Sequence, residues 1–275
     1  MTTRIDLITS ASRSKHVDVS LVTGTLNEVG NVQSFLEAVR RELEKVGSFE
    51  IIIVDDGSTD GTIECLKQIA SSDARVIVIA NNRRRGLLRS HLQAMALANG
   101  QYCIVMDSDL QHPAHIIPQI VEDLRRGYGI VICSRYITGG SPGDRNAVRG
   151  VISRMAIVIA KLILPSARCT TDPVSGYFGV ERTNFIASSG SEKGYKTLLL
   201  VLANHYSGYI KDMPYNFAKR SKGESKIVSD WRFAINYFFE VIQARKSYSE
   251  TRRMAHSPLP VPDQTDSGAD KISEG

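Results

Sequence analysis

Two aspartates at the end of an apolar run carry the clearest chemistry in this sequence. The run Cys103 to Met106 leads directly into Asp107 and Asp109, which are followed by the carboxamide of Gln111 and by Pro113. Mg²⁺ and Mn²⁺ prefer oxygen ligands, and Mg²⁺ usually takes one or two protein carboxylates together with waters and substrate phosphates. The two aspartates therefore indicate a divalent-cation site. An acidic turn that caps the next helix is the alternative interpretation.

A second acidic turn follows the apolar run Glu50 to Val54. It begins with Asp55 and Asp56 and continues as Gly-Ser-Thr-Asp-Gly-Thr. The glycines permit tight backbone turns and the hydroxyl residues can cap a helix. A carboxylate at such a strand end can accept hydrogen bonds from nucleobase N–H groups or ribose hydroxyls. An ordinary strand-to-helix turn without a ligand has the same composition.

The segments around these turns alternate between strand and helix patterns. The strands are expected at Val17–Thr23, Glu50–Val54, Arg75–Ala80, Gln101–Met106 and Gly129–Ser134, and the helices at Glu28–Val46, Thr59–Ser71 and Leu87–Ala98. Repeated units of this kind predict an α/β fold with a mostly parallel, twisted sheet flanked by helices. The polar tips of three strands, including Gly24–Glu28, then meet at one edge and describe a nucleotide pocket beside a metal. Neither a dinucleotide-binding glycine pattern nor a P-loop is present.

Composition limits the partners of the chain. Hydrophobic residues make up 42% of its 275 residues, enough for one large core or two small ones. The net charge of +5 favours an anionic partner. Nucleic acid is not expected, because the Lys and Arg residues are dispersed and no recognition module is evident. The four cysteines lack metal-site spacing and suit a reducing compartment.

The ends of the chain differ in composition from its middle. We expect a disordered leader at 1–17, a catalytic domain at 18–248 and a disordered polar tail at 249–275. Apolar helices are expected near 148–164 and 230–246, where aromatic and basic residues suit either a membrane interface or ordinary core packing. No signal peptide or spanning segment is recognisable. We therefore expect peripheral membrane contact at the cytoplasmic inner face, or contact through a membrane subunit. Assembly as a homo-oligomer is a further expectation that stays open.

The order of short motifs resembles a known enzyme family. The motifs are G-T-L-N-E, V-D-D-G-S-T-D-G-T, M-D-S-D-L-Q-H-P, S-R-Y, R-x-x-x-S, D-x-x-S-G-Y, E-K-G-Y-K and R-x-x-G-E-S-K. This order, from about Val19 to Ile227, resembles the polyprenyl-phosphate glycosyltransferases of the inverting GT-A class, with the dolichyl-phosphate mannose synthases nearest. The resemblance implies metal-dependent transfer of mannose from GDP-mannose onto the phosphate of a polyprenol such as dolichyl phosphate.

The resemblance also implies roles for individual residues. The cation, Mg²⁺ or Mn²⁺, would bind at Asp107, Asp109 and Gln111. The nucleotide sugar would bind at Thr25, Asn27, Glu28, Asp55, Asp56, Arg84, Ser108, Arg220 and Lys226. Acceptor phosphate and catalysis would involve Asp109, Arg135, Arg149 and Ser153. Later motifs add Asp172, Ser175 and Gly176 without individual roles.

Two positions depart from the family pattern and leave the donor open. Gly24 begins a loop that lacks the usual aromatic residue, and Leu88 replaces the second glycine of a G-L-G loop that follows three arginines. UDP-glucose or another donor therefore stays an alternative.

The implied chemistry needs no catalytic base. A phosphate monoester has its second pKa near 6, so it is mostly a dianionic nucleophile at neutral pH. A metal would stabilise the leaving diphosphate, Arg135 and Arg149 would hold the acceptor phosphate, and in-line attack would invert the anomeric centre. Transfer to a saccharide or small-molecule hydroxyl would instead need a base, with Asp172 the candidate. A non-enzymatic nucleotide-binding subunit is the third reading. His112 and His115 are interpreted as helix-start residues, and His91, His205 and His256 as incidental.

Overall fold

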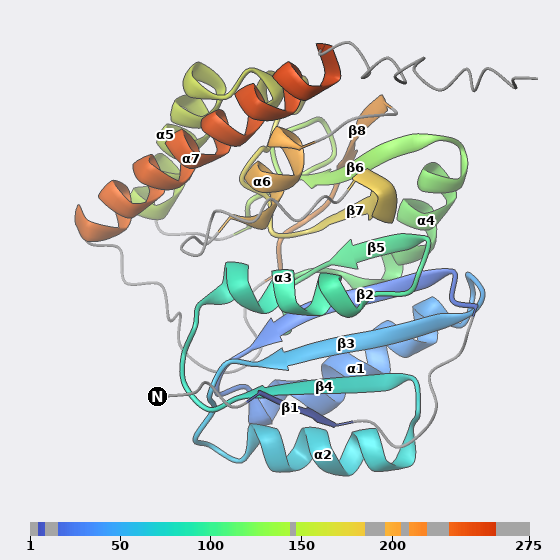
Figure 1. The fold of residues 1–275 in the computed structure, drawn as a ribbon. Helices are drawn as coiled ribbons and strands as arrows, with labels where there is room; N and C mark the ends of the chain where they lie inside the picture. The colour runs from blue at the N-terminus through green and yellow to red at the C-terminus, as the bar shows by residue number, and fades with distance from the viewer. Residues whose placement is uncertain are drawn as a thin grey trace, which may run out of the picture.

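One sheet dominates the computed structural model, which describes residues 5–8, 16–143, 147–184, 196–204, 209–218 and 231–256. Within these ranges eight strands are ordered β1-β4-β3-β2-β5-β7-β6-β8 (Figure 1). Their bounds are β1 Ile5–Ile8, β2 Val19–Thr25, β3 Phe49–Asp55, β4 Val76–Asn81, β5 Tyr102–Val105, β6 Tyr128–Ser134, β7 Phe178–Glu181 and β8 Tyr209–Pro214. The α/β fold with a mostly parallel sheet is confirmed.

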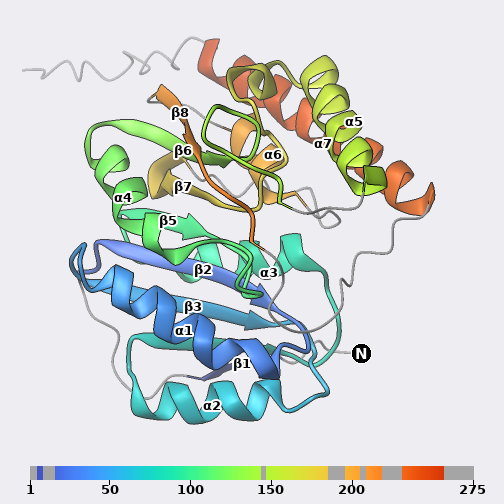
Figure 2. The same cartoon turned by 180° about the vertical axis from the view of Figure 1, so that it is seen from behind.

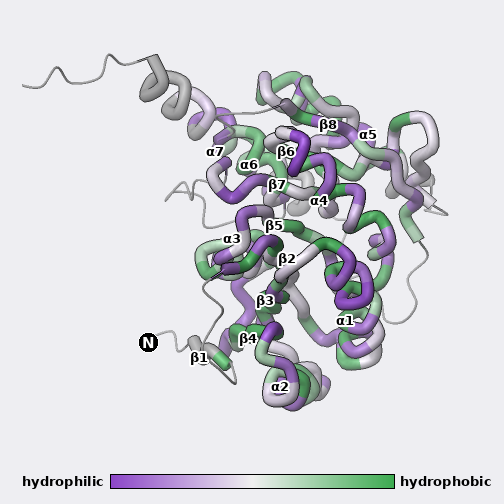
Figure 3. Tube along the Cα trace, turned by 90° about the vertical axis from the view of Figure 1, so that its right-hand side faces the viewer, coloured by the Kyte–Doolittle hydropathy of each residue, from purple (hydrophilic) through white to green (hydrophobic). Residues whose placement is uncertain are grey.

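Helices cover both faces of this sheet. Their bounds are α1 Val29–Leu43, α2 Thr62–Ser72, α3 Leu87–Leu97, α4 Ile117–Arg125, α5 Ala147–Ile163, α6 Thr197–Ala203 and α7 Trp231–His256. Seen along the sheet, α1 and α2 lie on one side and α3 on the other (Figure 3). The strand-helix alternation expected for the amino-terminal half is therefore confirmed.

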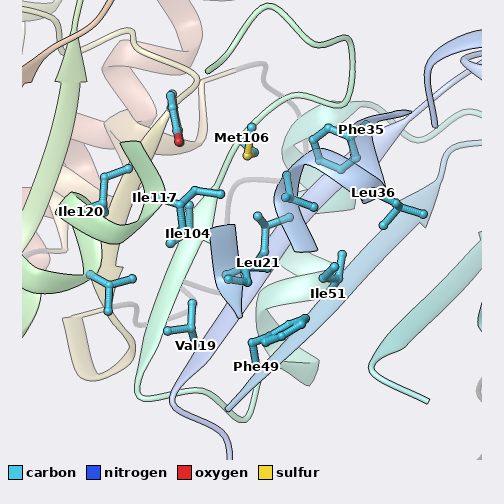
Figure 4. Packing of buried hydrophobic residues seen from close by; sticks show 14 of the residues in the cluster. Val19, Leu21, Phe35, Leu36, Phe49, Ile51, Ile104, Met106, Ile117 and Ile120 are labelled. Carbon is cyan, nitrogen blue, oxygen red and sulfur yellow. The ribbon is translucent and has the colours of Figure 1, made fainter. Parts of the chain in front are cut away.

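The apolar strands divide their side chains between two cores. Alternate residues of a strand point to opposite faces, so Ile51 and Ile53 of β3 join one cluster while Ile52 and Val54 join the other. The first cluster contains Phe35 and neighbouring residues of α1, together with residues of α2 and α4 (Figure 4). The second contains residues of α3, α5, α6 and α7. Burial on both faces explains why these strands are uninterrupted runs of Ile and Val.

The directions of the strands determine which loops meet. β2, β3, β4, β5, β6 and β8 run one way, whereas β1 and β7 pair antiparallel with their neighbours. The carboxyl ends of the parallel strands therefore share one edge with the amino end of β7. This edge, where α/β sheets place their ligands, gathers the loops that start at Asp55, Asp107 and Arg135 and the segment 172–176.

The predicted boundaries need two corrections. Ile5–Ile8, inside the expected disordered leader, form strand β1, which pairs antiparallel with β4. A short strand can order such a segment because the free edge of a sheet offers unpaired backbone groups. At the other end, α7 continues to His256 and therefore extends past the expected boundary at 248.

The two apolar helices expected at the carboxyl-terminal side are α5 and α7, which pack side by side (Figure 2). The Tyr237 hydroxyl of α7 donates a hydrogen bond to the Ala156 carbonyl of α5 at 2.7 Å. α5 buries Ala160 but also carries an exposed apolar stripe, with side chains 55–70% exposed at Val151, Met155, Val158 and Leu162. In the part of the chain that the structure describes, no helix has both the length and the apolar character needed to span a bilayer.

Candidate functional site

The predicted metal ligands lie in the loop after β5, residues 106–113, which we call the metal loop. Asp107 keeps 35% of its side chain exposed, and its Oδ2 lies 3.2 Å from Nε2 of His112. Asp109 is nearly buried and its Oδ1 accepts a hydrogen bond from the Gln111 backbone N–H at 3.1 Å. Leu110, between Asp109 and Gln111, adopts a positive φ of 62°, a conformation that non-glycine residues rarely adopt and that often marks functional turns.

The amide of Gln111 is oriented by the segment after β8. Its Nε2 donates to the Ala218 carbonyl at 3.0 Å, and the Ala218 N–H donates back to the Gln111 carbonyl. The Oε1 atom is then the part of the amide suited to a cation. Among the described residues no group of three or more His, Cys, Asp or Glu is arranged to hold a metal. Two carboxylates and one amide oxygen fit a cation that shares its remaining positions with donor phosphates.

His112 has a larger part in this site than the sequence suggests. Its ring is buried among Tyr177, Tyr215 and Phe217, with ring centroids 5.1–5.6 Å away. Burial raises the pKa of Asp107, but the hydrogen bond and charge of His112 outweigh it, and the pKa falls to about 2. His112 therefore favours the ionised form of Asp107, and it also lies just before the short helix that begins at Ala114.

His91 of α3 makes a structural contact that the sequence alone does not show. The side chain is buried, and Nδ1 lies 2.8 Å from the Thr197 hydroxyl at the start of α6. Burial lowers the pKa of His91 to about 4 despite the opposing charge of Asp107. This histidine is therefore neutral at physiological pH and ties α3 to α6 beside the metal loop. Only the tertiary contact, between residues far apart in sequence, reveals it.

The first donor loop is fixed to the second by short hydrogen bonds. Asn27, with a positive φ of 51°, donates its backbone N–H to the Ser58 hydroxyl and accepts from the Thr59 N–H at its Oδ1, each at 2.8 Å. Glu28 donates its N–H to the Thr62 hydroxyl. The side chains of these two predicted donor-binding residues thus face the protein: Asn27 joins two loops, and Glu28 accepts a bond from Asn31.

The two aspartates after β3 have different surroundings. Asp55 accepts backbone N–H bonds at Oδ1, while its Oδ2 is buried without a hydrogen-bond partner in the described structure. The Thr25 hydroxyl at the end of β2 is in the same state. Because buried polar atoms are normally paired, these two atoms are well suited to receive a nucleoside.

Asp56 has both carboxylate oxygens engaged. They accept backbone N–H bonds from Arg85 at 2.7 Å and Gly86 at 2.9 Å. Asp56 thereby shapes the loop that presents the exposed Arg84. Ser108 donates its hydroxyl to the Gly24 carbonyl at 3.3 Å, which joins the metal loop to the donor loop.

The predicted acceptor side contains a buried ion pair. Arg135 donates from Nε and Nη2 to the two oxygens of Asp172 at 2.7 and 2.8 Å, and both residues are buried. Burial lowers the pKa of Arg135, but Asp172 outweighs it and raises the pKa above its usual value. The neighbouring Tyr136 donates its hydroxyl to Ser153 of α5 at 2.9 Å. The structure therefore brings two predicted acceptor-side residues, Arg135 and Ser153, to one region.

Several predicted residues have other positions. Ser175 donates its hydroxyl to the Cys133 carbonyl and is structural. A Cβ on Gly176 would lie 3.2 Å from Asp107 Oδ2, so the glycine permits the segment to approach the metal loop. Arg149 lies in α5, and its side chain is not among those that the structure describes. Arg220 and Lys226 lie outside the described residues.

Known proteins with similar sequences point to one family. The family model described as glycosyl transferase family 2 matches residues 20–182. Dolichol-phosphate mannosyltransferase of Pyrococcus furiosus is 33% identical over 209 residues, which cover 76% of this chain and 59% of that protein. The protein of that name from Saccharomyces cerevisiae is 33% identical over 187 residues, covering 65% of this chain and 68% of its own.

A solved structure has a similar fold. Glucosyl-3-phosphoglycerate synthase from Mycobacterium tuberculosis, in complex with Mn²⁺, UDP-glucose and phosphoglyceric acid, superposes with a TM-score of 0.61 at 20% identity and covers 87% of each chain. At that identity the likeness concerns the fold alone. With a family model matching more than half of its residues, the chain belongs to glycosyl transferase family 2.

Proposed function

We propose that this protein transfers mannose from GDP-mannose, with inversion, onto the phosphate of a polyprenol such as dolichyl phosphate. The names of the relatives from Pyrococcus furiosus and Saccharomyces cerevisiae support the substrate class. The observation that carries the proposal is the shared sheet edge. There the carboxylates of Asp107 and Asp109 follow β5, and the buried Arg135–Asp172 pair follows β6 and precedes β7.

The ion pair favours a phosphate over a hydroxyl as acceptor. A hydroxyl acceptor would need Asp172 as base, but Asp172 is fully buried and both of its oxygens accept hydrogen bonds from Arg135. A monoester phosphate, with its second pKa near 6, attacks without losing a proton in the reaction. The unengaged edge of the Arg135 guanidinium carries further N–H donors for that phosphate.

The residues of this chain then share the remaining work. Asp55 Oδ2 and the Thr25 hydroxyl receive the nucleoside, and the oxygens of Asp107, Asp109 and Gln111 suit Mg²⁺ or Mn²⁺. Bound there, such a cation supplies neutralisation of the charge that develops on the leaving diphosphate. An acceptor phosphate held near Arg135 attacks the anomeric carbon from the side opposite the diphosphate. That geometry converts an α-linked donor into a β-linked product.

Membrane contact of α5 and α7 belongs to the same proposal. The exposed stripe of α5 includes Met155 and Leu162, and α7 exposes Phe238 and Phe239 at 46% and 59%. An apolar surface of this kind, on helices that do not span, suits the headgroup boundary of a bilayer. The protein would then work peripherally at the cytoplasmic face, where its lipid acceptor is held, alone, as a homo-oligomer or with a membrane subunit.

A donor panel tests the proposal. Radiolabelled GDP-mannose, UDP-glucose and UDP-mannose are offered to the protein with dolichyl phosphate in vesicles, with Mn²⁺, Mg²⁺ or a chelator. We expect a mild-acid-labile, solvent-extractable mannolipid from GDP-mannose only in the presence of the metal. Extractable product from UDP-glucose alone would correct the donor, and water-soluble product alone would refute the lipid acceptor.

A further inference from the structure

Lys196 is a cation near the reacting groups that no step above uses. It lies at the amino end of α6, and its ammonium Nζ donates a hydrogen bond to the Val174 carbonyl at 3.1 Å. Val174 is the middle residue of the segment 172–176, which leads into β7. Lys196 belongs to the E-K-G-Y-K motif, but the sequence alone assigns it no role.

The segment 172–176 links Lys196 to two predicted site residues. Asp172 at one end holds the guanidinium of Arg135, and Gly176 at the other end lies against the carboxylate of Asp107. The bond to Val174 therefore places the ammonium beside a segment that contacts both the predicted acceptor-side arginine and the predicted metal-site aspartate. Burial lowers the pKa of Lys196, the charge of Arg135 adds to this effect, and the charge of Asp107 opposes it.

The backbone of Lys196 is held by a helix on the candidate membrane side. Its N–H donates to a carboxylate oxygen of Glu240, a nearly buried residue of α7. The rest of α6 is buried in the core shared with α5 and α7. The backbone of Lys196 is thus held by α7, while its side chain is half-buried. An ammonium has three N–H donors, and the bond to Val174 uses one.

We propose that Lys196 contacts the phosphate of the lipid acceptor beside Arg135. The inference rests on the proposed function, because it takes a polyprenyl phosphate as the substrate. Two positions favour the acceptor over the donor as the ligand of Lys196. The helix that Lys196 precedes, α6, packs on α5 and α7 on the candidate membrane side. The predicted nucleoside-binding Asp55 ends β3, which is separated from β7 by β2 and β5. The half-buried ammonium of Lys196 is repelled by the positive charge of Arg135. An anion that contacts both cations therefore lowers their electrostatic energy the most.

Matched variants separate acceptor binding from donor binding. Lys196→Met removes the charge and keeps the chain length, Lys196→Arg keeps the charge, and Lys67→Met makes the same change at an exposed position of α2. Calorimetry measures binding of a short-chain polyprenyl phosphate and, separately, of GDP-mannose with Mn²⁺. We expect Lys196→Met to weaken acceptor binding about tenfold or more, as for loss of a hydrogen bond to a charged group. Donor binding should stay within about twofold, with Lys67→Met unchanged and Lys196→Arg intermediate.

A labelling experiment on the wild-type protein keeps the test independent of folding. Lysines are acetylated with and without the short-chain polyprenyl phosphate, and modification is measured by mass spectrometry. We expect the acceptor to protect Lys196 and not Lys67. Equal loss of donor and acceptor binding in Lys196→Met, loss of donor binding alone, or no protection would overturn the role. Protection without any sugar transfer would refute the proposed function and leave the phosphate contact intact.

Discussion

The ion pair between Arg135 and Asp172 gives the sharpest test of the proposed chemistry. Asp172 is fully buried and Arg135 only 6% exposed, with two short charge-assisted hydrogen bonds between them. Removing one partner of such a pair leaves a buried charge uncompensated, which typically costs about 3–5 kcal/mol. For a chain of this size that corresponds to a fall in Tm of roughly 10 °C. Asp172→Asn should show a loss of this size.

A double-mutant cycle isolates the pair from its surroundings. Asp172→Asn, Arg135→Met and the double variant are compared by urea unfolding, since contacting residues show coupling energies beyond additivity. The double variant should be much more stable than the sum of the two single losses predicts, because no unpaired charge remains. Near-additive losses would refute the reasoning.

The same variants distinguish the two acceptor chemistries. If Asp172 only orients Arg135, Asp172→Asn should weaken acceptor binding while the pH dependence of kcat keeps its shape. If Asp172 were a general base for a hydroxyl acceptor, its removal would abolish the acidic limb of the profile. A stable Asp172→Asn protein that lacks this limb would therefore contradict the ion-pair interpretation.

Three further predictions concern the metal loop and its neighbours. Asp109→Ala should abolish turnover while changing Tm by no more than a few degrees, as measured by sugar transfer and thermal unfolding, because the change removes no apolar side chain from either hydrophobic cluster. Gly176→Ala should weaken Mn²⁺ binding by calorimetry, because its Cβ would lie 3.2 Å from Asp107 Oδ2 and 3.6 Å from His112 Nε2; unchanged affinity would contradict the tight approach. His91 has its pKa lowered from 6.5 to about 4, so the unfolded chain binds the extra proton first and stability should fall as pH drops from about 6.5 to 4. His91→Gln removes the titrating group and should flatten that part of the stability curve. For a pKa shift of this size, the free energy of unfolding that becomes independent of pH is up to about 3 kcal/mol. An unchanged pH dependence of urea unfolding would show that His91 is not the source.

The amino-terminal half of the fold could be predicted because its strands are buried on both faces. Runs such as Ile51–Val54 have no polar interruption, and polar turns bound them. The later strands lack this pattern: β7 is only Phe178–Glu181, with Gly179 packed closely under Ile120. β8 is an edge strand that contains Lys211 and Asp212. Such strands are defined by their neighbours in the sheet and not by their own composition.

The candidate site was predictable where a single loop carries the chemistry. Asp107 and Asp109 are two residues apart, so their types and spacing indicate a cation site without knowledge of the fold. The partners of these residues come from distant segments and could not be predicted in this way. The position of His112 is determined by the rings of Tyr177 and Tyr215. The hydrogen bonds of Asp56 are determined by the way the loop after β4 folds back.

The reversed direction of β7 explains how the two halves of the site come together. In an all-parallel sheet, the segment before β7 would lie at the opposite edge from Asp107. Because β7 pairs antiparallel with both β5 and β6, its amino end reaches the carboxyl edge and delivers segment 172–176 between the metal loop and Arg135. One short segment then binds Arg135 through Asp172, holds Lys196 through the Val174 carbonyl and approaches Asp107 at Gly176. The predicted donor-side and acceptor-side charges are therefore positioned by the same five residues, so a substitution that shifts this segment should disturb both substrates together. A substitution at Lys196 alone should not.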